Sequence, residues 1–351
     1  MDFNTEFGFP CVIREQNTPH IAKRIFDLLD QEALCKSRAV SRGWQILVDS
    51  STTFWSDFGS IQIIEAVKDE RLDIIQLFIE NAKVPNPPAD TGFTPLHMAA
   101  TVGHIAIFKM IFDCVLDKNP KDCDGLTPVH FAAHDGYLEI CQLVIHEVTD
   151  KNPCSKSGMT PLHYAARKGC LEVYKLISNS VGHENPSCTS GRTPLHEAAH
   201  QGHNDICEFI INNVDDKNPA VQHRVTPLHL AAWAENWDIC KLIIDNVQEK
   251  NPAKIDGVTP LHYLALKGHF DLCQLIIKSV NDKNPANANG ITPLHNAART
   301  GHLDICKLIL RNIDMKNPPD FTGETPFDLA KKNGFEAICD LIYNECDVVF
   351  Q

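Results

Sequence analysis

Seven histidines occupy one position of a repeated string, and they are the first residues with the chemistry to hold a metal or move a proton. Each follows Thr-Pro-Leu or Thr-Pro-Val, at His97, His130, His163, His196, His229, His262 and His295. The 33-residue spacing puts one histidine in each structural unit, too far from the next for a shared metal ion. The pattern suggests no Ser-His-Asp or Cys-His arrangement. We therefore expect structural hydrogen bonds, with no catalytic residue, metal or cofactor.

Cysteines follow the same period in six of fourteen cases, at Cys141, Cys207, Cys240, Cys273, Cys306 and Cys339. Each comes after Ile or Leu in an apolar stretch, where a thiol behaves as a small buried apolar group. The chain has no close Cys-x-x-Cys pair. We expect reduced, buried thiols in this set, whereas the reactivity of the other eight cysteines stays open.

The unit that carries these residues is a helix pair. Thr-Pro steps begin at Thr94, Thr127, Thr160, Thr193, Thr226, Thr259, Thr292 and Thr325. Threonine suits a helix N-cap and proline the first helical position, and Gly103 suits the helix end. A second apolar stretch with helical spacing follows, from Leu138 to Val148 in one copy. A Lys-Asn-Pro triplet then turns the chain outward.

The string Gly-x-Thr-Pro-Leu-His-x-Ala-Ala-x-x-Gly-His resembles the ankyrin repeat. The resemblance implies stacked helix pairs with projecting turns, and a concave side that binds other proteins. We expect an all-α solenoid of nine repeats over residues 61–346, in which the first repeat, from Ile61, lacks the Thr-Pro-Leu-His string and the last carries Asp328 instead of histidine. Asn119, Asn152 and their equivalents resemble the hairpin asparagine that this family presents for hydroxylation.

The segment before the repeats has the spacing of three short amphipathic helices. Its residues Ile25-Phe26, Leu29-Asp30, Val40-Ser41-Arg42 and Trp55 resemble the F-box, although Thr18 stands where that family usually has leucine. The resemblance implies a helical module at 18–58, after an extension at 1–17, that binds a Skp-type adaptor and through it a cullin complex. The expected adaptor-binding residues are Pro19, Ile21, Leu28, Leu29, Leu34, Val40 and Trp44.

Residues that differ between repeats are the candidates for partner recognition, since the shared ones build the stack. The Thr226 repeat carries Arg224 and Glu235 where other repeats have glycine, together with two of the four tryptophans. Such departures beside large aromatic side chains are typical of a binding surface. We expect a client protein to contact Phe131, His134, Tyr164, Arg167, His200, Trp233, Trp237 and Tyr263, although Trp233 covering an irregular turn is an equally weighted alternative.

The composition favours a protein partner. Net charge is −13, so neither nucleic acid nor an anionic membrane has an electrostatic basis for binding. The start of the chain has no long apolar run, and we expect a cytoplasmic or nuclear protein, monomeric within its complex. The leading hypothesis is a non-catalytic substrate receptor of a ubiquitin ligase, and the alternative is an ankyrin-repeat scaffold without any ligase link.

Overall fold

The computed structural model describes residues 60–347, and every regular element in that range is helical. The chain divides into two compact units after Cys123, so the described residues are 60–123 of the first unit and 124–347 of the second. The expected F-box-like module and all seven expected adaptor-binding residues lie outside the described residues.

Residues 60–123 of the first unit form two helix pairs. They are α5 (Ser60–Lys68) with α6 (Leu72–Asn81), and α7 (Pro95–Val102) with α8 (Ile105–Cys114). Helix α5 packs on α7, and α6 packs on α8. The pair α5–α6 occupies the segment in which the sequence predicts a first repeat without the Thr-Pro-Leu-His string.

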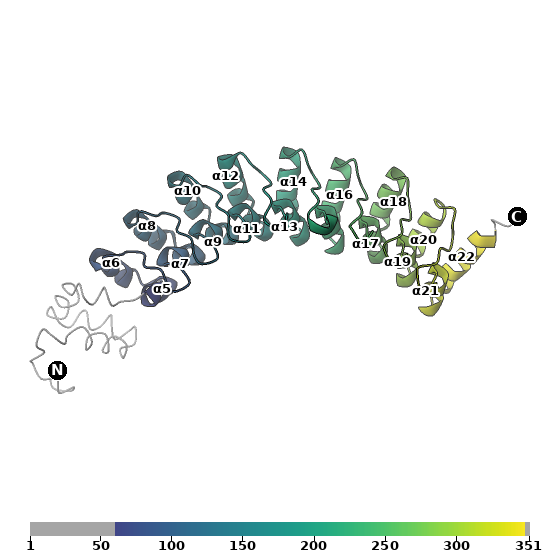
Figure 1. Ribbon diagram of the computed structural model, residues 1–351, viewed down its shortest axis with the longest axis horizontal. Helices are drawn as coiled ribbons and strands as arrows, with labels where there is room; N and C mark the ends of the chain where they lie inside the picture. Colours follow the sequence, from purple (N-terminus) through teal and green to yellow (C-terminus); the bar gives the residue numbers. More distant parts are fainter. Residues whose placement is uncertain (1–59, 348–351) are drawn as a thin grey trace, which may run out of the picture. The chain divides into compact units, whose positions relative to one another are not determined.

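The second unit contains two parallel rows of helices (Figure 1). The first row is α9 (Pro128–Asp135), α11 (Pro161–Lys168), α13 (Pro194–Gln201), α15 (Pro227–Trp233), α17 (Pro260–Lys267), α19 (Pro293–Thr300) and α21 (Pro326–Lys332). The second row is α10 (Leu138–Glu147), α12 (Leu171–Val181), α14 (Asn204–Asn213), α16 (Trp237–Asn246), α18 (Phe270–Ser279), α20 (Leu303–Leu310) and α22 (Glu336–Asp347). Each helix packs on the next one in its row and on its own pair partner, which confirms the all-α solenoid.

Each first-row helix begins where the sequence predicts, and all but α15 and α21 in the second unit end at a left-handed glycine. Thr292 is the N-cap of α19 and its hydroxyl accepts a hydrogen bond from the His295 N–H, while Pro293 takes the first helical position. Gly301 ends the helix with φ 83°, in the left-handed region that favours glycine. Because proline needs no N–H partner at the first turn and glycine tolerates positive φ, the repeated string sets both ends of the helix.

Small apolar residues on the first-row helices and branched ones on the second row form the core. In the Thr226 repeat the fully buried side chains are Leu228, Ala231, Ala232, Ile239, Cys240, Ile243 and Ile244. The alanines let neighbouring first-row helices approach closely, and each buried leucine or isoleucine contributes about 1.5–3 kcal/mol. Since this pattern recurs every 33 residues, the core is a continuous column.

The Lys-Asn-Pro turns are held by the asparagine amide. Asn218 Oδ1 accepts the Leu228 N–H at 3.0 Å, and the Asn218 N–H donates to Asp216 Oδ1 at 3.2 Å. The same bond joins Asn152 to Leu162 at 3.2 Å. These asparagines therefore fix the loop onto the first turn of the following helix, where donors would otherwise lack partners.

The terminal repeat replaces the histidine cap with a carboxylate. Asp328 Oδ2 accepts from the Thr325 N–H at 3.0 Å and from the Thr325 hydroxyl at 2.6 Å. These hydrogen bonds lower the pKa of Asp328. Asp328 therefore caps α21 as the histidines cap the other first-row helices.

Candidate protein-interaction surface

The repeated histidines are structural, as their spacing predicts. His163 Nδ1 accepts the Thr160 N–H at 3.1 Å, and its Nε2 lies 3.0 Å from the Arg192 carbonyl of the next repeat. An N–H can only donate and a carbonyl can only accept, so the ring is neutral with its proton on Nε2. Bonds of the same kind begin at His130, His196, His229, His262 and His295.

Burial keeps these rings neutral. Removal from water lowers the pKa of His163, His229 and His262 to about 4 and that of His196 to about 3. Protonation would also place an N–H on Nδ1 against the threonine N–H. The histidines thus form a ladder of hydrogen bonds through the second unit, and they are engaged on both nitrogens.

The periodic cysteines are buried from Cys141 to Cys306, whereas Cys339, in the last helix, is half-buried. Burial raises the pKa of Cys141, Cys240 and Cys306 to about 12, so these thiols stay protonated and inert. Within residues 60–347, no group of three or more His, Cys, Asp or Glu side chains is arranged to hold a metal ion.

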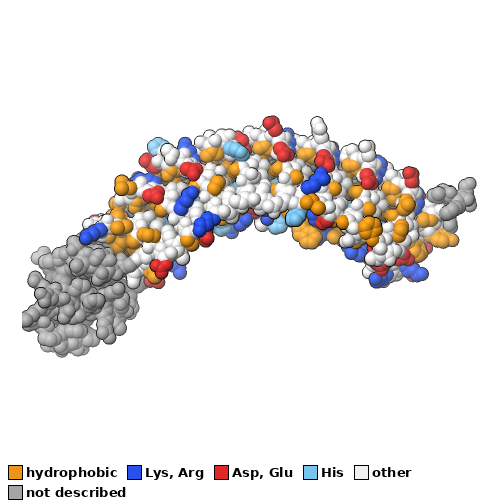
Figure 2. Space-filling model, in the orientation of Figure 1, with side chains coloured by type: hydrophobic (Ala, Val, Ile, Leu, Met, Phe, Trp, Pro, Cys, Tyr) orange, Lys and Arg blue, Asp and Glu red, His pale blue; other side chains and the backbone are white. Residues whose placement is uncertain are grey.

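The expected client-binding residues fall on both rows. All but Trp237 belong to first-row helices, namely Phe131, His134, Tyr164, Arg167, His200, Trp233 and Tyr263. Trp233 is 56% exposed, and the other six are partly exposed. Trp237 begins α16 in the second row. Figure 2 shows hydrophobic and histidine side chains along the lower edge of the second unit, where the middle of the first row lies.

One of the predicted residues, Arg167, contacts a buried carboxylate. We call Glu197, Arg167 and Arg192 the Glu197 cluster. Arg167 Nε donates to Glu197 Oε2 at 2.9 Å, and Arg192 Nε lies 3.1 Å from Oε1. The glutamate side chain is 3% exposed, but the arginine side chains are 40% and 38% exposed. One buried negative charge therefore holds two half-exposed positive ones.

Aromatic neighbours flank the Glu197 cluster. The Arg167 guanidinium lies 5.8 Å from the centre of the Tyr164 ring, within cation–π range. The His134 ring lies 6.1 Å from the same tyrosine in an edge-on arrangement. His200 stands apart from this group, and its Nδ1 lies 3.3 Å from the Gln201 amide nitrogen. The structure therefore brings together three of the predicted residues, His134, Tyr164 and Arg167.

The second group is called the Trp233 cluster, made of Trp233, Tyr263, Lys254, Lys267 and Glu235. The two aromatic rings meet edge to face at 5.5 Å. Lys267 Nζ lies 5.9 Å from the Trp233 ring centre and 2.5 Å from Glu235 Oε1, and Lys254 Nζ lies 3.2 Å from the Tyr263 hydroxyl. An exposed indole beside a half-buried phenol offers apolar contact, and the two nearby ammonium groups are paired with Glu235 and Asp256.

The predicted client-binding set omits Arg192, Lys254, Lys267 and Glu197, although the sequence places Glu197 among the variable positions and Lys254 at a turn tip. Glu197 occupies the repeat position of Tyr164 and Tyr263, so the variable positions already contained it. The signal was a lone acidic residue among aromatic and aliphatic ones at a position that faces a neighbouring repeat. Its two arginine partners come from α11 and from the loop before α13, which the spacing alone does not bring together.

The Thr226 repeat keeps left-handed backbone without glycine. Glu235 has φ 64° and Arg224 has φ 59°, at the positions of Gly268 and Gly257 in the next repeat. Side chains in this region cost about 1 kcal/mol or more each. The next residue, Asn236, has φ −85°, so the left-handed position stays at Glu235.

The residue that follows a first-row helix lies close to the next repeat, and in the Thr226 repeat that residue is Glu235. Cβ atoms at Gly202 and Gly268 would lie 2.8 Å from Asn236 and 2.5 Å from the His302 ring, so the residue after a first-row helix touches the next repeat. Beside Glu235, the His269 ring packs against Trp237 at 4.7 Å. Trp237 is therefore a packing partner of the next repeat on the second row, apart from the Trp233 cluster.

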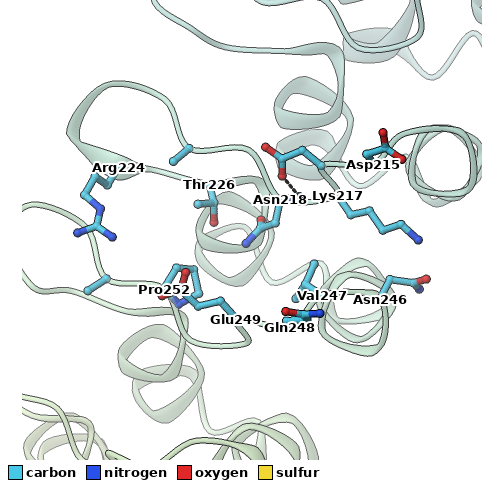
Figure 3. Close-up of a pocket in the computed structure, with 13 residues that line it drawn as sticks. Asp215, Lys217, Asn218, Arg224, Thr226, Asn246, Val247, Gln248, Glu249 and Pro252 are labelled. Carbon is cyan, nitrogen blue, oxygen red and sulfur yellow. Dashed lines mark hydrogen bonds between the residues drawn. The ribbon is translucent and has the colours of Figure 1, made fainter.

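A pocket of about 410 Å³ lies between the loops that follow α14 and α16 (Figure 3). Asp215, Asp216, Lys217, Arg224 and Glu249 are its charged lining residues. In Figure 3 Arg224 stands at one end and Asp215 at the other. None of the predicted client-binding residues lines it, so this pocket is separate from both clusters.

Family comparison identifies the repeats. Models described as ankyrin repeats (3 copies) match residues 111–187, 173–254, 238–319 and 261–351, and one described as ankyrin repeats (many copies) matches residues 63–112. The chain belongs to the ankyrin-repeat family. A search of curated proteins gave no match. The matched ranges begin after the F-box-like segment.

Membership in this family assigns the array to protein binding. Ankyrin-repeat proteins are typically non-catalytic interaction modules, and the repeats imply a protein partner. No helix between residues 60 and 347 is long and apolar enough to cross a membrane.

Proposed function

We propose that the chain is the substrate receptor of an adaptor–cullin ubiquitin ligase. In this proposal residues 18–58 bind a Skp-type adaptor, and the repeats at 61–346 bind the client protein. The ligase link rests on the ordered F-box-like residues from Pro19 to Trp55. The client-binding role is supported by the family and by one observation above others, the 56% exposed Trp233 packed against Tyr263.

Such a receptor performs no bond chemistry. It holds the client near the conjugating enzyme and raises the effective concentration of the client's lysines there. A rigid array suits this role, because each repeat is fixed to the next by a histidine hydrogen bond and a continuous core. A flexible connection would reduce the gain in effective concentration.

Co-purification of the full chain with a Skp-type adaptor tests the ligase link. We expect the adaptor to be retained by the wild type and lost from a Leu28→Asp, Leu34→Asp variant, because charged side chains disrupt an apolar interface. Leu116 is fully exposed, and Leu116→Asp is the matched control that keeps the adaptor. Adaptor binding by the double variant, or none by the wild type, would leave the scaffold alternative in place.

The client surface is tested separately. A Trp233→Ala, Tyr263→Ala variant removes the aromatic pair on the first row. We expect it to lose capture of proteins that the wild-type chain retains, while its helical content and adaptor binding stay unchanged. Undiminished capture by the double variant would move the client site away from the Trp233 cluster.

A further inference from the structure

Charge in the second unit is divided between the two helix rows. The seven first-row helices carry six Lys or Arg residues against three Asp or Glu. The seven second-row helices carry four against thirteen. The first row therefore has an excess of three positive charges within a chain of net charge −13.

The Glu197 cluster concentrates this positive charge in a defined geometry. Arg167 donates its Nε to Glu197, whereas Arg192 Nε lies 3.1 Å from the same carboxylate without forming a hydrogen bond. Neither terminal Nη group of Arg167 or Arg192 makes a hydrogen bond to any residue in 60–347. Guanidinium Nη groups bind carboxylates with high geometric specificity. Glu197 thus holds two guanidinium side chains that are 40% and 38% exposed, and the net charge of the cluster is +1.

The Trp233 cluster lies two helix steps further along the same row and supplies apolar contact. Trp233 is on α15 and Tyr263 on α17. The Lys254 and Lys267 ammonium groups lie near these rings, but they are paired with Asp256 and Glu235. The Glu197 cluster therefore favours an acidic residue of the partner, and the Trp233 cluster favours a large apolar one.

We propose that the first row binds an extended acidic protein segment, with a carboxylate on the Arg167–Arg192 pair and an apolar anchor on Trp233 and Tyr263. This inference rests on the proposed client-binding role of the surface and adds the chemistry of the client. The cluster centres are two helix steps apart, about 20 Å at about 10 Å per step. An extended chain covers that distance in about six residues, which sets the spacing between the acidic and apolar side chains.

Peptide selection on the full chain tests the proposal. A random twelve-residue peptide library displayed on phage is selected against the wild type, and the recovered peptides are synthesised with a fluorescein label for affinity measurement. We expect enrichment of Asp and Glu with one large apolar residue about six positions away. Recovery of neutral or basic peptides, or of none that needs Trp233, would overturn the proposal.

Variants separate the two contacts. An Arg167→Gln, Glu197→Gln, Arg192→Gln variant removes the positive charge and leaves no buried charge without a partner, so the fold is kept. We expect it to weaken binding of the selected peptides at least about tenfold and to reduce the salt dependence of that binding. The matched control is Lys241→Gln on the second row, which removes the same net charge of one and should leave affinity unchanged. Equal weakening by both variants would contradict recognition by the Glu197 cluster.

The outcomes distinguish this inference from the proposed function. Peptides that need Trp233 but carry no acidic residues would refute the acidic chemistry and leave the client surface intact. Peptides that bind independently of Trp233 would refute both the acidic chemistry and the client-binding role of the Trp233 cluster. Adaptor co-purification is unaffected by either result. A fluorescein-labelled twelve-nucleotide oligothymidine that binds as tightly as the best peptide would assign the positive charge to nucleic acid and overturn the proposal.

Discussion

The Thr226 and Thr259 repeats are neighbours with the same frame and different surfaces. Both begin with a Thr-Pro-Leu-His cap and bury the same kind of apolar core. They differ where Glu235 and Arg224 replace glycine, and where Trp233 replaces Leu266. The comparison shows that the cap and core determine the fold, whereas the turn and the last helical turn are free to carry recognition.

Acidification protonates the histidine caps that the two repeats share. It has the largest expected effect on the free energy of unfolding. The pKa values of His163, His196, His229 and His262 lie at about 3 to 4 in the folded chain and near 6.5 in the unfolded one. The contribution of these neutral histidines to the free energy of unfolding is therefore complete above pH 6.5, and it is lost as pH falls toward 4. Protonation of each histidine lowers the free energy of unfolding by up to about 1.4 kcal/mol per pH unit in that window.

Urea unfolding followed by circular dichroism between pH 7 and pH 5 measures this loss. Carboxylates stay largely ionised over that range, so the histidines dominate the change. We expect the midpoint to fall steeply below pH 6.5. A midpoint that is constant down to pH 5 would mean that the histidine ladder does not stabilise the array.

Removal of one histidine tests the same shared frame at a single position. His229→Ala leaves the Thr226 N–H and the Val258 carbonyl without partners and opens a small cavity. We expect a loss of about 3 kcal/mol in the free energy of unfolding. His146→Ala is the control, since its side chain is 85% exposed, and it should change stability by less than about 0.5 kcal/mol. Similar losses in both variants would contradict the ladder.

Restoring glycine tests the difference between the two repeats. Glu235→Gly removes a side chain from left-handed backbone and loses only the exposed ion pair with Lys267. We expect a gain of about 1 kcal/mol in the free energy of unfolding. Gly268→Ala is the reciprocal change, and it should destabilise because its Cβ would lie 2.5 Å from the His302 ring. A loss of stability in Glu235→Gly would show that the glutamate supports the local packing.

The sequence predicts the frame because the determinants are local and repeated. Thr292, Pro293 and Gly301 lie within one helix and its caps, so their types set its ends wherever the string occurs. The histidine hydrogen bonds follow as well, since every neighbour offers a carbonyl at the same place. Repetition thus extends one local rule over the eight repeats that begin with a Thr-Pro step.

The site is less predictable because its contacts occur once. The Arg167–Glu197 bond joins residues 30 positions apart and depends on the side-chain rotamers of two long residues. Trp233 and Trp237 are close in sequence, yet one is on the first row and the other packs against His269 on the second. Variable positions point to the first row as the candidate recognition surface, but they do not show which of those side chains meet.

Trp233→Ala has the smallest expected effect on stability, and it decides whether Trp233 serves recognition or covers an irregular turn. The indole is 56% exposed and lies at the end of α15, so its removal should change the free energy of unfolding by less than about 0.5 kcal/mol. Leu228→Ala, in the same helix but fully buried, should cost about 3 kcal/mol. If Trp233→Ala is as destabilising as Leu228→Ala, the tryptophan covers an irregular turn. If it is neutral in unfolding and deleterious only to peptide binding, its exposure serves recognition.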